Sequence, residues 1–196
     1  GDALDNQVSG WISRLSTDLP ILKLSVSTGR VVDFRAKASL CADPGPGTVP
    51  LIYPGHLQNG AVVWPRTGWK KANAIRRDID TEALLMPAGV YVLVKRFSTK
   101  EERRRVVATL FDSSRLAAKR IGFENHLNVY HQDGAGIDPN LAKGLVLFLN
   151  STLIDTYFRQ FSGHTQVNAT DLRKFKYPTQ AQLESLGSKM GEAFPS

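Results

Sequence analysis

Basic and aromatic side chains are concentrated in the block from Arg66 to Arg105. This block holds eleven lysines and arginines against five acidic residues, while the segments before and after it are close to neutral. It also contains Trp69 and Tyr91, and Trp64 lies two residues before it. A local excess of positive charge neutralises phosphates and releases counterions. The pattern therefore favours a polyanionic partner, and the alternative is a solvated basic face that only keeps the chain in solution.

Side chains of the types that read DNA lie in and around this block. Arginine and lysine form paired hydrogen bonds with guanine, asparagine and glutamine do so with adenine, and further groups hold the phosphates. The candidate DNA contacts are His56, Gln58, Asn59, Trp69, Lys70, Lys71, Asn73, Arg76, Arg77, Lys95, Arg96, Lys100, Arg103, Arg104, Arg105, His164, Thr165, Gln166, Asn168 and Arg173.

Each group of candidates has a structural alternative. Asn59 precedes Gly60, and this pair is typical of a hairpin turn. Thr165 and Asn168 are suited to capping local backbone, although a helix that begins near Asn168 also offers N–H groups to a phosphate. In a strand, residues 103–105 would alternate between faces, so only one or two of them would reach one duplex.

The usual catalytic patterns are absent from the sequence. It contains no GxxxxGK[ST], HExxH or GxSxG motif, and Cys41 is its only cysteine. His126 and His131 are five residues apart, which is not a same-face spacing on a strand. The segment 123–128 is interpreted as a structural strand with buried polar partners rather than as a DNA contact. We expect no catalytic residue, metal site or cofactor in this chain.

The sequence also predicts a protein without a membrane partner. No apolar run approaches the roughly 20 residues that a membrane-spanning helix needs. The first residues, GDALDNQVSG, lack the basic and apolar regions of a signal peptide. Together with the single cysteine, these features lead us to expect a cytoplasmic protein.

The hydrophobic pattern predicts one α+β domain with a mixed, largely antiparallel sheet, hairpins, a long helix and amphipathic terminal helices. Strands are expected within 21–34, 49–53, 61–64, 91–97, 103–111 and 123–131, and helices over 3–16, 139–160, from Asn168 up to Pro178, and over 179–190. For the residues after Ser98 a helix is the alternative, because Ser98 and Glu101 have capping-box spacing. We expect a linker helix in 1–20, the main domain in 21–178, and a C-terminal helix and tail in 179–196.

Several segments together resemble a known family. They are STGRVVDFR (27–35), VPLIYPGHLQNGAVVWP (49–65), GVYVLVKRFSTKEERRRVVA (89–108), GFENHLNVYH (122–131) and GLVLFLNSTLIDTYFRQFSGHTQVNATDLRKFKYP (144–178). They resemble the target-recognition domain of adenine-N6 DNA methyltransferases of Type II restriction-modification systems. A looser similarity extends to the specificity subunits of Type I systems. The most specific piece is SGHTQVNATDLRKFKYP.

The resemblance implies a module that reads a short duplex sequence. In that family a separate domain binds S-adenosylmethionine and methylates a flipped adenine, and no NPPY-type tetrapeptide or glycine motif for the methyl donor occurs here. We therefore expect either an excised part of a methyltransferase, which the linker helix favours, or a stand-alone specificity protein. Its expected partners are duplex DNA, the catalytic domain and a cognate restriction endonuclease system. The alternatives are a nuclease whose carboxylates assemble only in the fold, and a protein-interaction module of the same system.

Overall fold

The computed structural model describes residues 6, 10, 12–98, 102–161 and 166–190. Within them the chain has the predicted α+β architecture. The strands are β1 (Ser25–Thr28), β2 (Leu40–Cys41), β3 (Thr48–Ile52), β4 (Leu57–Gln58), β5 (Ala61–Val62), β6 (Ala74–Arg76), β7 (Leu85–Pro87), β8 (Val90–Lys95), β9 (Ala108–Asp112), β10 (Arg120–Phe123) and β11 (Leu127–His131). The α-helices are α2 (Pro139–Leu149), α3 (Thr152–Phe161), α4 (Ala169–Leu172) and α5 (Gln180–Met190). Short 3-10 turns are η1 (Asp33–Arg35), η2 (Lys37–Ser39), η3 (Pro54–His56), η4 (Glu82–Leu84) and η5 (Ser113–Leu116).

The strands form two main sheets and a small hairpin. One sheet has the order β1-β11-β8-β9 and is antiparallel throughout. The other has the order β2-β6-β3-β10-β7, in which β3 and β10 are parallel and the remaining pairs antiparallel. β4 and β5 pair across Asn59 and Gly60, whose φ angles are 53° and 79°. The predicted tight turn at these two residues is confirmed.

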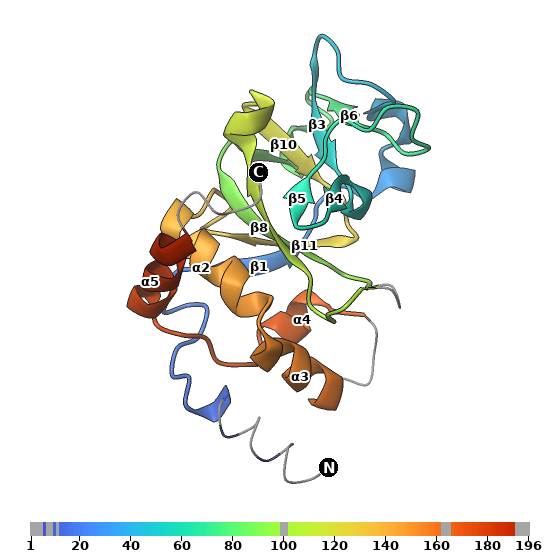
Figure 1. Ribbon diagram of the computed structural model, residues 1–196. Coiled ribbons are helices and arrows are strands. Elements are labelled where there is room, and N and C mark those ends of the chain that lie inside the picture. Colours follow the sequence, from blue (N-terminus) through green and yellow to red (C-terminus); the bar gives the residue numbers. More distant parts are fainter. Residues whose placement is uncertain (1–5, 7–9, 11, 99–101, 162–165, 191–196) are drawn as a thin grey trace.

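Alternation along β8 explains how the layers stack. Val92 and Val94 pack in the core shared with α2, whereas Tyr91 and Leu93 pack in the core shared with β10. Because successive side chains of a strand point to opposite faces, the four-stranded sheet is buried on both sides. Figure 1 shows α2 and α5 on one side of this sheet and the five-stranded sheet on the other.

The predicted hairpin of β8 and β9 is present, but β9 begins only at Ala108. Residues 102–107 are irregular, so the predicted strand from 103 and the alternative helix are both wrong there. The Asn150 side chain accepts the Ala108 N–H (2.8 Å) and donates to the Ala108 carbonyl (2.9 Å). Asp155 accepts the Arg105 N–H at 2.8 Å. The backbone of Arg105 and Ala108 is therefore bonded to side chains at and after the break between α2 and α3.

The long helix predicted over 139–160 is divided into α2 and α3. Its start is as predicted, because Asp138 accepts the N–H groups of Asn140 (3.1 Å) and Leu141 (3.2 Å). The break falls at Asn150 and Ser151, where the Asn150 amide is bonded to β9 instead of lying along a helix surface. Gly163, the expected stop, lies outside the described residues.

Other predicted elements are shorter than expected. The strand predicted within 21–34 covers only Ser25–Thr28, and 123–131 holds the last residue of β10 and the whole of β11, separated by a turn. A Cβ atom added at Gly29 would overlap the backbone carbonyl of Glu124 in that turn, so only glycine allows this approach. The capping box of Asn168 and Asp171 is confirmed, and α4 ends at Leu172, well before Pro178.

The last helix is held against α2 by two glycines. A Cβ atom at Gly144 would overlap the carbonyl oxygen of Leu183, and one at Gly187 would overlap that of Asn140. The two backbones therefore touch directly. Leu183 is fully buried, as the amphipathic pattern predicts, whereas Leu186 is partly exposed.

The start of the chain packs onto this body. Of the helix predicted over residues 3–16, the described residues 6, 10, 12 and 13 are helical, whereas residues 14–16 form a turn and irregular chain, so the predicted end at 16 is wrong; the other residues of that range lie outside the described residues. Ile12 joins the core, and Thr17 pairs with Tyr177 through N–H to carbonyl bonds of 3.2 and 2.7 Å. No helix in the described ranges is long and apolar enough to cross a membrane.

Candidate nucleic-acid interface

An open cleft of about 410 Å³ lies where four segments of the chain meet. These segments are η3, the loop between β5 and β6, the end of β8, and the turn between β10 and β11. We call it the aromatic cleft, and its lining residues are Tyr53, Pro54, Gly55, Arg66, Trp69, Lys71, Phe97, Glu124 and His126.

The loop that forms one wall of the cleft is organised by Asn73. This residue is buried, and its amide donates to the carbonyls of Ala42 (3.0 Å) and Arg66 (2.8 Å). Its Oδ1 accepts the Arg66 N–H (2.9 Å) and lies 2.8 Å from Nε2 of His56. His56 is itself fully buried and accepts the Tyr53 N–H at Nδ1 (2.9 Å), so its Nε2 carries the proton. The pKa of His56 is lowered from its ordinary value, and burial of the ring is the largest cause of this shift.

The geometry thus separates two candidate DNA contacts from the rest. His56 and Asn73 hold the loop in shape, and their polar atoms already have protein partners. We leave both out of the interface that we propose below.

Cations and rings alternate along the cleft wall. The Arg66 guanidinium lies 4.8 Å from the centre of the Trp69 ring, and Lys71 Nζ lies 5.2 Å from that of Tyr53. Tyr53 and Trp69 meet edge to face at 5.6 Å. Lys71 is also 3.6 Å from a carboxylate oxygen of Asp33. Burial and the nearby carboxylates raise the pKa of Tyr53, so its hydroxyl stays neutral.

The opposite wall carries a histidine held by a buried carboxylate. Glu124 is 1% exposed, and its carboxylate accepts the His126 N–H (2.9 Å) and lies 2.6 Å from Nδ1 of the same ring. The side chain of His126 is 49% exposed. Phe97, also 49% exposed, has its ring 5.8 Å from that of His126. The strand interpretation of this segment is correct for Asn128, which is buried and donates to the Val167 carbonyl, but His126 is at the surface.

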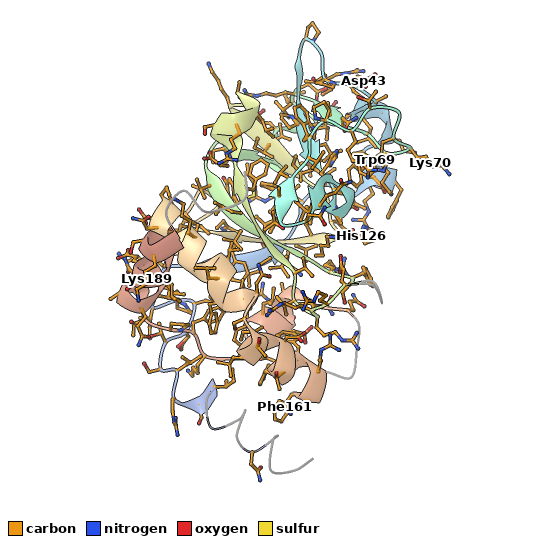
Figure 2. All side chains as sticks on the ribbon, viewed as in Figure 1. Asp43, Trp69, Lys70, His126, Phe161 and Lys189 are labelled. Atoms are coloured by element: carbon orange, nitrogen blue, oxygen red, sulfur yellow. The ribbon has the colours of Figure 1, made fainter. Side chains whose placement is uncertain are left out.

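Further candidates extend the same side of the molecule. Gln58, Asn59 and Lys70 are exposed. Figure 2 shows Trp69, Lys70 and His126 along one side, with Lys189 of α5 on the opposite side. The basic and aromatic residues of the loop are therefore brought together with the turn between β10 and β11.

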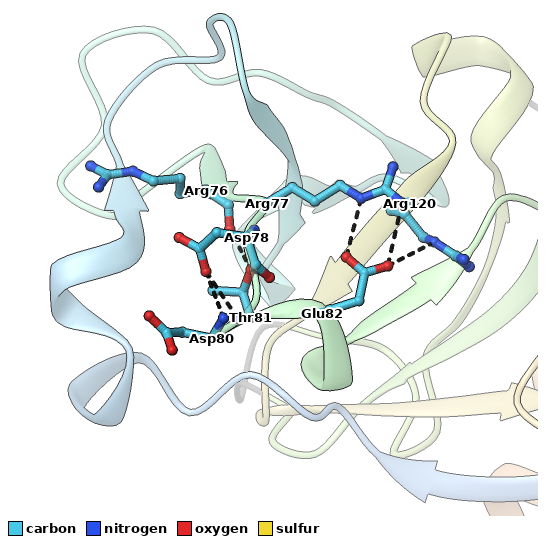
Figure 3. A network of polar contacts seen from close by, with 7 residues as sticks. All are labelled: Arg76, Arg77, Asp78, Asp80, Thr81, Glu82 and Arg120. Atoms are coloured by element: carbon cyan, nitrogen blue, oxygen red, sulfur yellow. Dashed lines mark hydrogen bonds and ion pairs between the residues drawn. The ribbon is translucent and has the colours of Figure 1, made fainter.

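Arg76 and Arg77 lie at the end of β6 in a polar network (Figure 3). The Arg77 guanidinium donates to the carboxylate of Glu82 at 3.1 and 3.3 Å, and Arg120 lies 3.4 Å from the same group. Thr81 donates to the Arg76 carbonyl at 2.6 Å. The Arg76 side chain is exposed, so it is the freer of the two arginines to meet a phosphate.

The basic residues after β8 have different surroundings. Lys95 pairs with Glu102 at 2.8 Å, and Arg96 donates to the Asn125 carbonyl at 3.0 Å. The Arg104 guanidinium donates to the Asn150 carbonyl, which places it against the break between α2 and α3. Arg103 is exposed, and Arg105 is half-buried. Lys100 lies outside the described residues.

The last group of candidates lies beside the end of β8. Gln166 forms a bridge with Phe97, and its side chain donates to Asn168 Oδ1 at 2.8 Å. Asn168 is the cap of α4, as its structural alternative predicts. Arg173 donates to the Val26 carbonyl at 2.5 Å. His164 and Thr165 lie outside the described residues.

In the part of the chain that the structure describes, no three histidine, cysteine or acidic side chains are grouped so as to hold a metal ion. The pairing of Glu124 with His126 was not predicted from the sequence. The only signal for it there is that the two residues are two positions apart within a predicted strand.

Comparison with known proteins finds relatives that are longer than this chain. It is 48% identical to the Type II methyltransferase M.PstI of Providencia stuartii over 95% of its length, and 52% identical to the Type II methyltransferase M.BsuBI of Bacillus subtilis over 85%. The chain spans about a third of the length of these curated relatives, 37% and 33%. No protein-family model matches it. The chain is therefore homologous to one segment of Type II methyltransferases.

Proposed function

We propose that this chain is the DNA target-recognition domain of a Type II adenine-N6 DNA methyltransferase, and that by itself it binds duplex DNA without catalysis. The observation that carries the proposal is a homology to Type II methyltransferases that covers nearly the whole chain and only a third of each relative. The same segment also carries a surface of basic and aromatic residues. That combination suits a part of the enzyme that holds the substrate.

The proposed interface is the side of the molecule that carries the aromatic cleft. Lys70, next to Trp69 and Lys71 of the cleft, is an exposed cation; Arg76 is exposed at the end of β6, and Arg103 is exposed on the segment after β8. Such side chains contact phosphates and set the position of the duplex. Gln58 and Asn59, at the exposed tip of the β4–β5 hairpin, supply amides that can read base edges in the major groove.

The remaining parts of the activity belong, in this proposal, to the rest of the methyltransferase. That part would bind S-adenosylmethionine and the adenine to be methylated, since an enzyme that modifies a base must take it out of the stack. The recognition domain would supply the orientation of the duplex. Its partners are then duplex DNA, the catalytic domain, and a cognate restriction endonuclease that acts on the same sequence in the cytoplasm.

Anisotropy of a labelled duplex across a salt series tests the proposal. We expect the affinity of the chain to fall steeply with salt, and Lys70→Ala to weaken binding to all sequences and to reduce the slope of log K against log salt by about 1. Lys189→Ala is the charge-matched control, because Lys189 is exposed on the opposite side of the molecule (Figure 2). Equal effects of the two variants would contradict the proposed interface.

A further inference from the structure

The aromatic cleft has the size of a site for a single small group. Base edges of a paired duplex lie inside a groove, and a protein reaches them with protruding side chains. The cleft is a hollow of about 410 Å³, which is within the range of sites that hold one small molecule, about 300–1,000 Å³. A single base that leaves the duplex is therefore a group of the right size for it.

The lining of the cleft has the chemistry that an unpaired nucleotide requires. Phe97 is 49% exposed, with the Arg96 guanidinium 5.7 Å from its ring centre, and stacking of a base on an aromatic side chain is worth about 1–3 kcal/mol. Arg66 and Lys71 lie in the same cleft and can meet the attached phosphate. The cleft therefore combines an aromatic surface with cations.

The cleft also contains one oriented polar group. The Glu124 carboxylate accepts the His126 backbone N–H at 2.9 Å, and its other oxygen lies 2.6 Å from Nδ1. A carboxylate can only accept, so Nδ1 carries the proton, and in the neutral form of the ring Nε2 accepts a hydrogen bond. Gly29, which has no Cβ, lets the Glu124 backbone pack closely and so fixes the turn that carries both residues.

We propose that the aromatic cleft binds an unpaired nucleobase of the bound DNA, stacked on Phe97 and hydrogen-bonded through Nε2 of His126. This inference rests on the proposed function. The cleft takes a base that has lost its partner, and a base with an N–H donor on its pairing edge satisfies Nε2. Glu124 is the positioning residue, because it acts through His126.

Binding to bulged duplexes tests the inference. The probes are a fully paired duplex and the same duplex with one extra, unpaired thymidine, whose ring offers an N–H donor. Extruding a paired base costs a few kcal/mol, and an unpaired base avoids most of this cost. We expect the chain to bind the bulged duplex at least about tenfold more tightly, which corresponds to about 1.4 kcal/mol.

Phe97→Leu and His126→Ala should each remove most of this preference, so that the bulged and the paired duplex bind with nearly equal affinity. Phe161→Leu is the control for the first, since Phe161 is 51% exposed and Figure 2 shows it on α3, away from Trp69 and His126. Glu124→Gln should reduce the preference less than His126→Ala does. Thermal unfolding of each variant checks that the fold is retained.

The outcomes separate the two proposals. Absence of binding to either duplex would overturn the proposed function, and the inference with it. Salt-dependent binding to both duplexes with equal affinity would overturn the inference alone. So would a preference for the bulge that Phe97→Leu and His126→Ala leave intact.

Discussion

Replacing Asn73 by alanine distinguishes a structural role for this residue from direct DNA reading. Its side chain takes part in four hydrogen bonds, with the Ala42 carbonyl, both backbone groups of Arg66, and Nε2 of His56. Asn73 is 2% exposed and His56 is 0% exposed, so water does not replace these bonds without rearrangement. Each bond contributes about 1 kcal/mol net, and a buried group left without a partner costs about 1–3 kcal/mol.

We therefore expect Asn73→Ala to lower the free energy of unfolding by about 4 kcal/mol, a large part of the 5–15 kcal/mol that is typical of a domain. For a chain of this size, this corresponds to a fall in Tm of about 8–16 °C. Thermal and urea unfolding followed by circular dichroism measure both quantities. Asn140→Ala is the matched control, because Asn140 is exposed in the first turn of α2 and should change stability by less than about 0.5 kcal/mol.

The structural role of Asn73 would be refuted by an Asn73→Ala protein that unfolds like the parent chain and yet loses its preference among DNA sequences. That result would place Asn73 at a base edge and not inside the loop. A destabilised variant whose DNA affinity recovers at low temperature would agree with the buried position.

Two further predictions concern stability. Acid should destabilise the protein below pH 6.5, because burial lowers the pKa of His56 and His131 and each accepts a backbone N–H at Nδ1. Below pH 6.5 and above the lowered pKa values the unfolded chain binds more protons, so the free energy of unfolding decreases as the pH is lowered, by up to about 2.7 kcal/mol per pH unit for the two residues. Urea titrations over this window measure the slope, and a His56→Gln, His131→Gln variant that keeps the full slope would contradict the prediction. Gly144→Ala should cost about 1–3 kcal/mol, because the new methyl group overlaps the Leu183 carbonyl, whereas Gly45→Ala, which meets no atom within 4 Å, is the control in the same thermal assay. Equal melting temperatures for the two glycine variants would show that α2 and α5 do not touch as described.

Features that depend on neighbouring residues could be predicted from the sequence. The helix start at Asp138 and Pro139, the turn at Asn59 and Gly60, and the capping box of Asn168 are all local arrangements, and all three are present. The charge of the block around the cleft is equally a property of the sequence. The fold class followed from such local patterns.

Features that depend on distant partners could not be predicted. Asn150 divides the predicted long helix because its amide bonds to Ala108, 42 residues away. His56 meets Asn73 17 residues along the chain, and both had the residue types of DNA readers. A polar side chain has the same sequence signature whether it faces a base or a buried backbone group, and only packing decides between the two.

The most direct test of whether this chain reads DNA sequence is to let the chain alone select preferred sequences from a random duplex pool. We expect salt-dependent capture of the pool and enrichment of one short motif, because the chain would carry the base-reading side chains itself. Binding without enrichment, or no binding at low salt, would contradict the assignment of a sequence-reading domain to this chain.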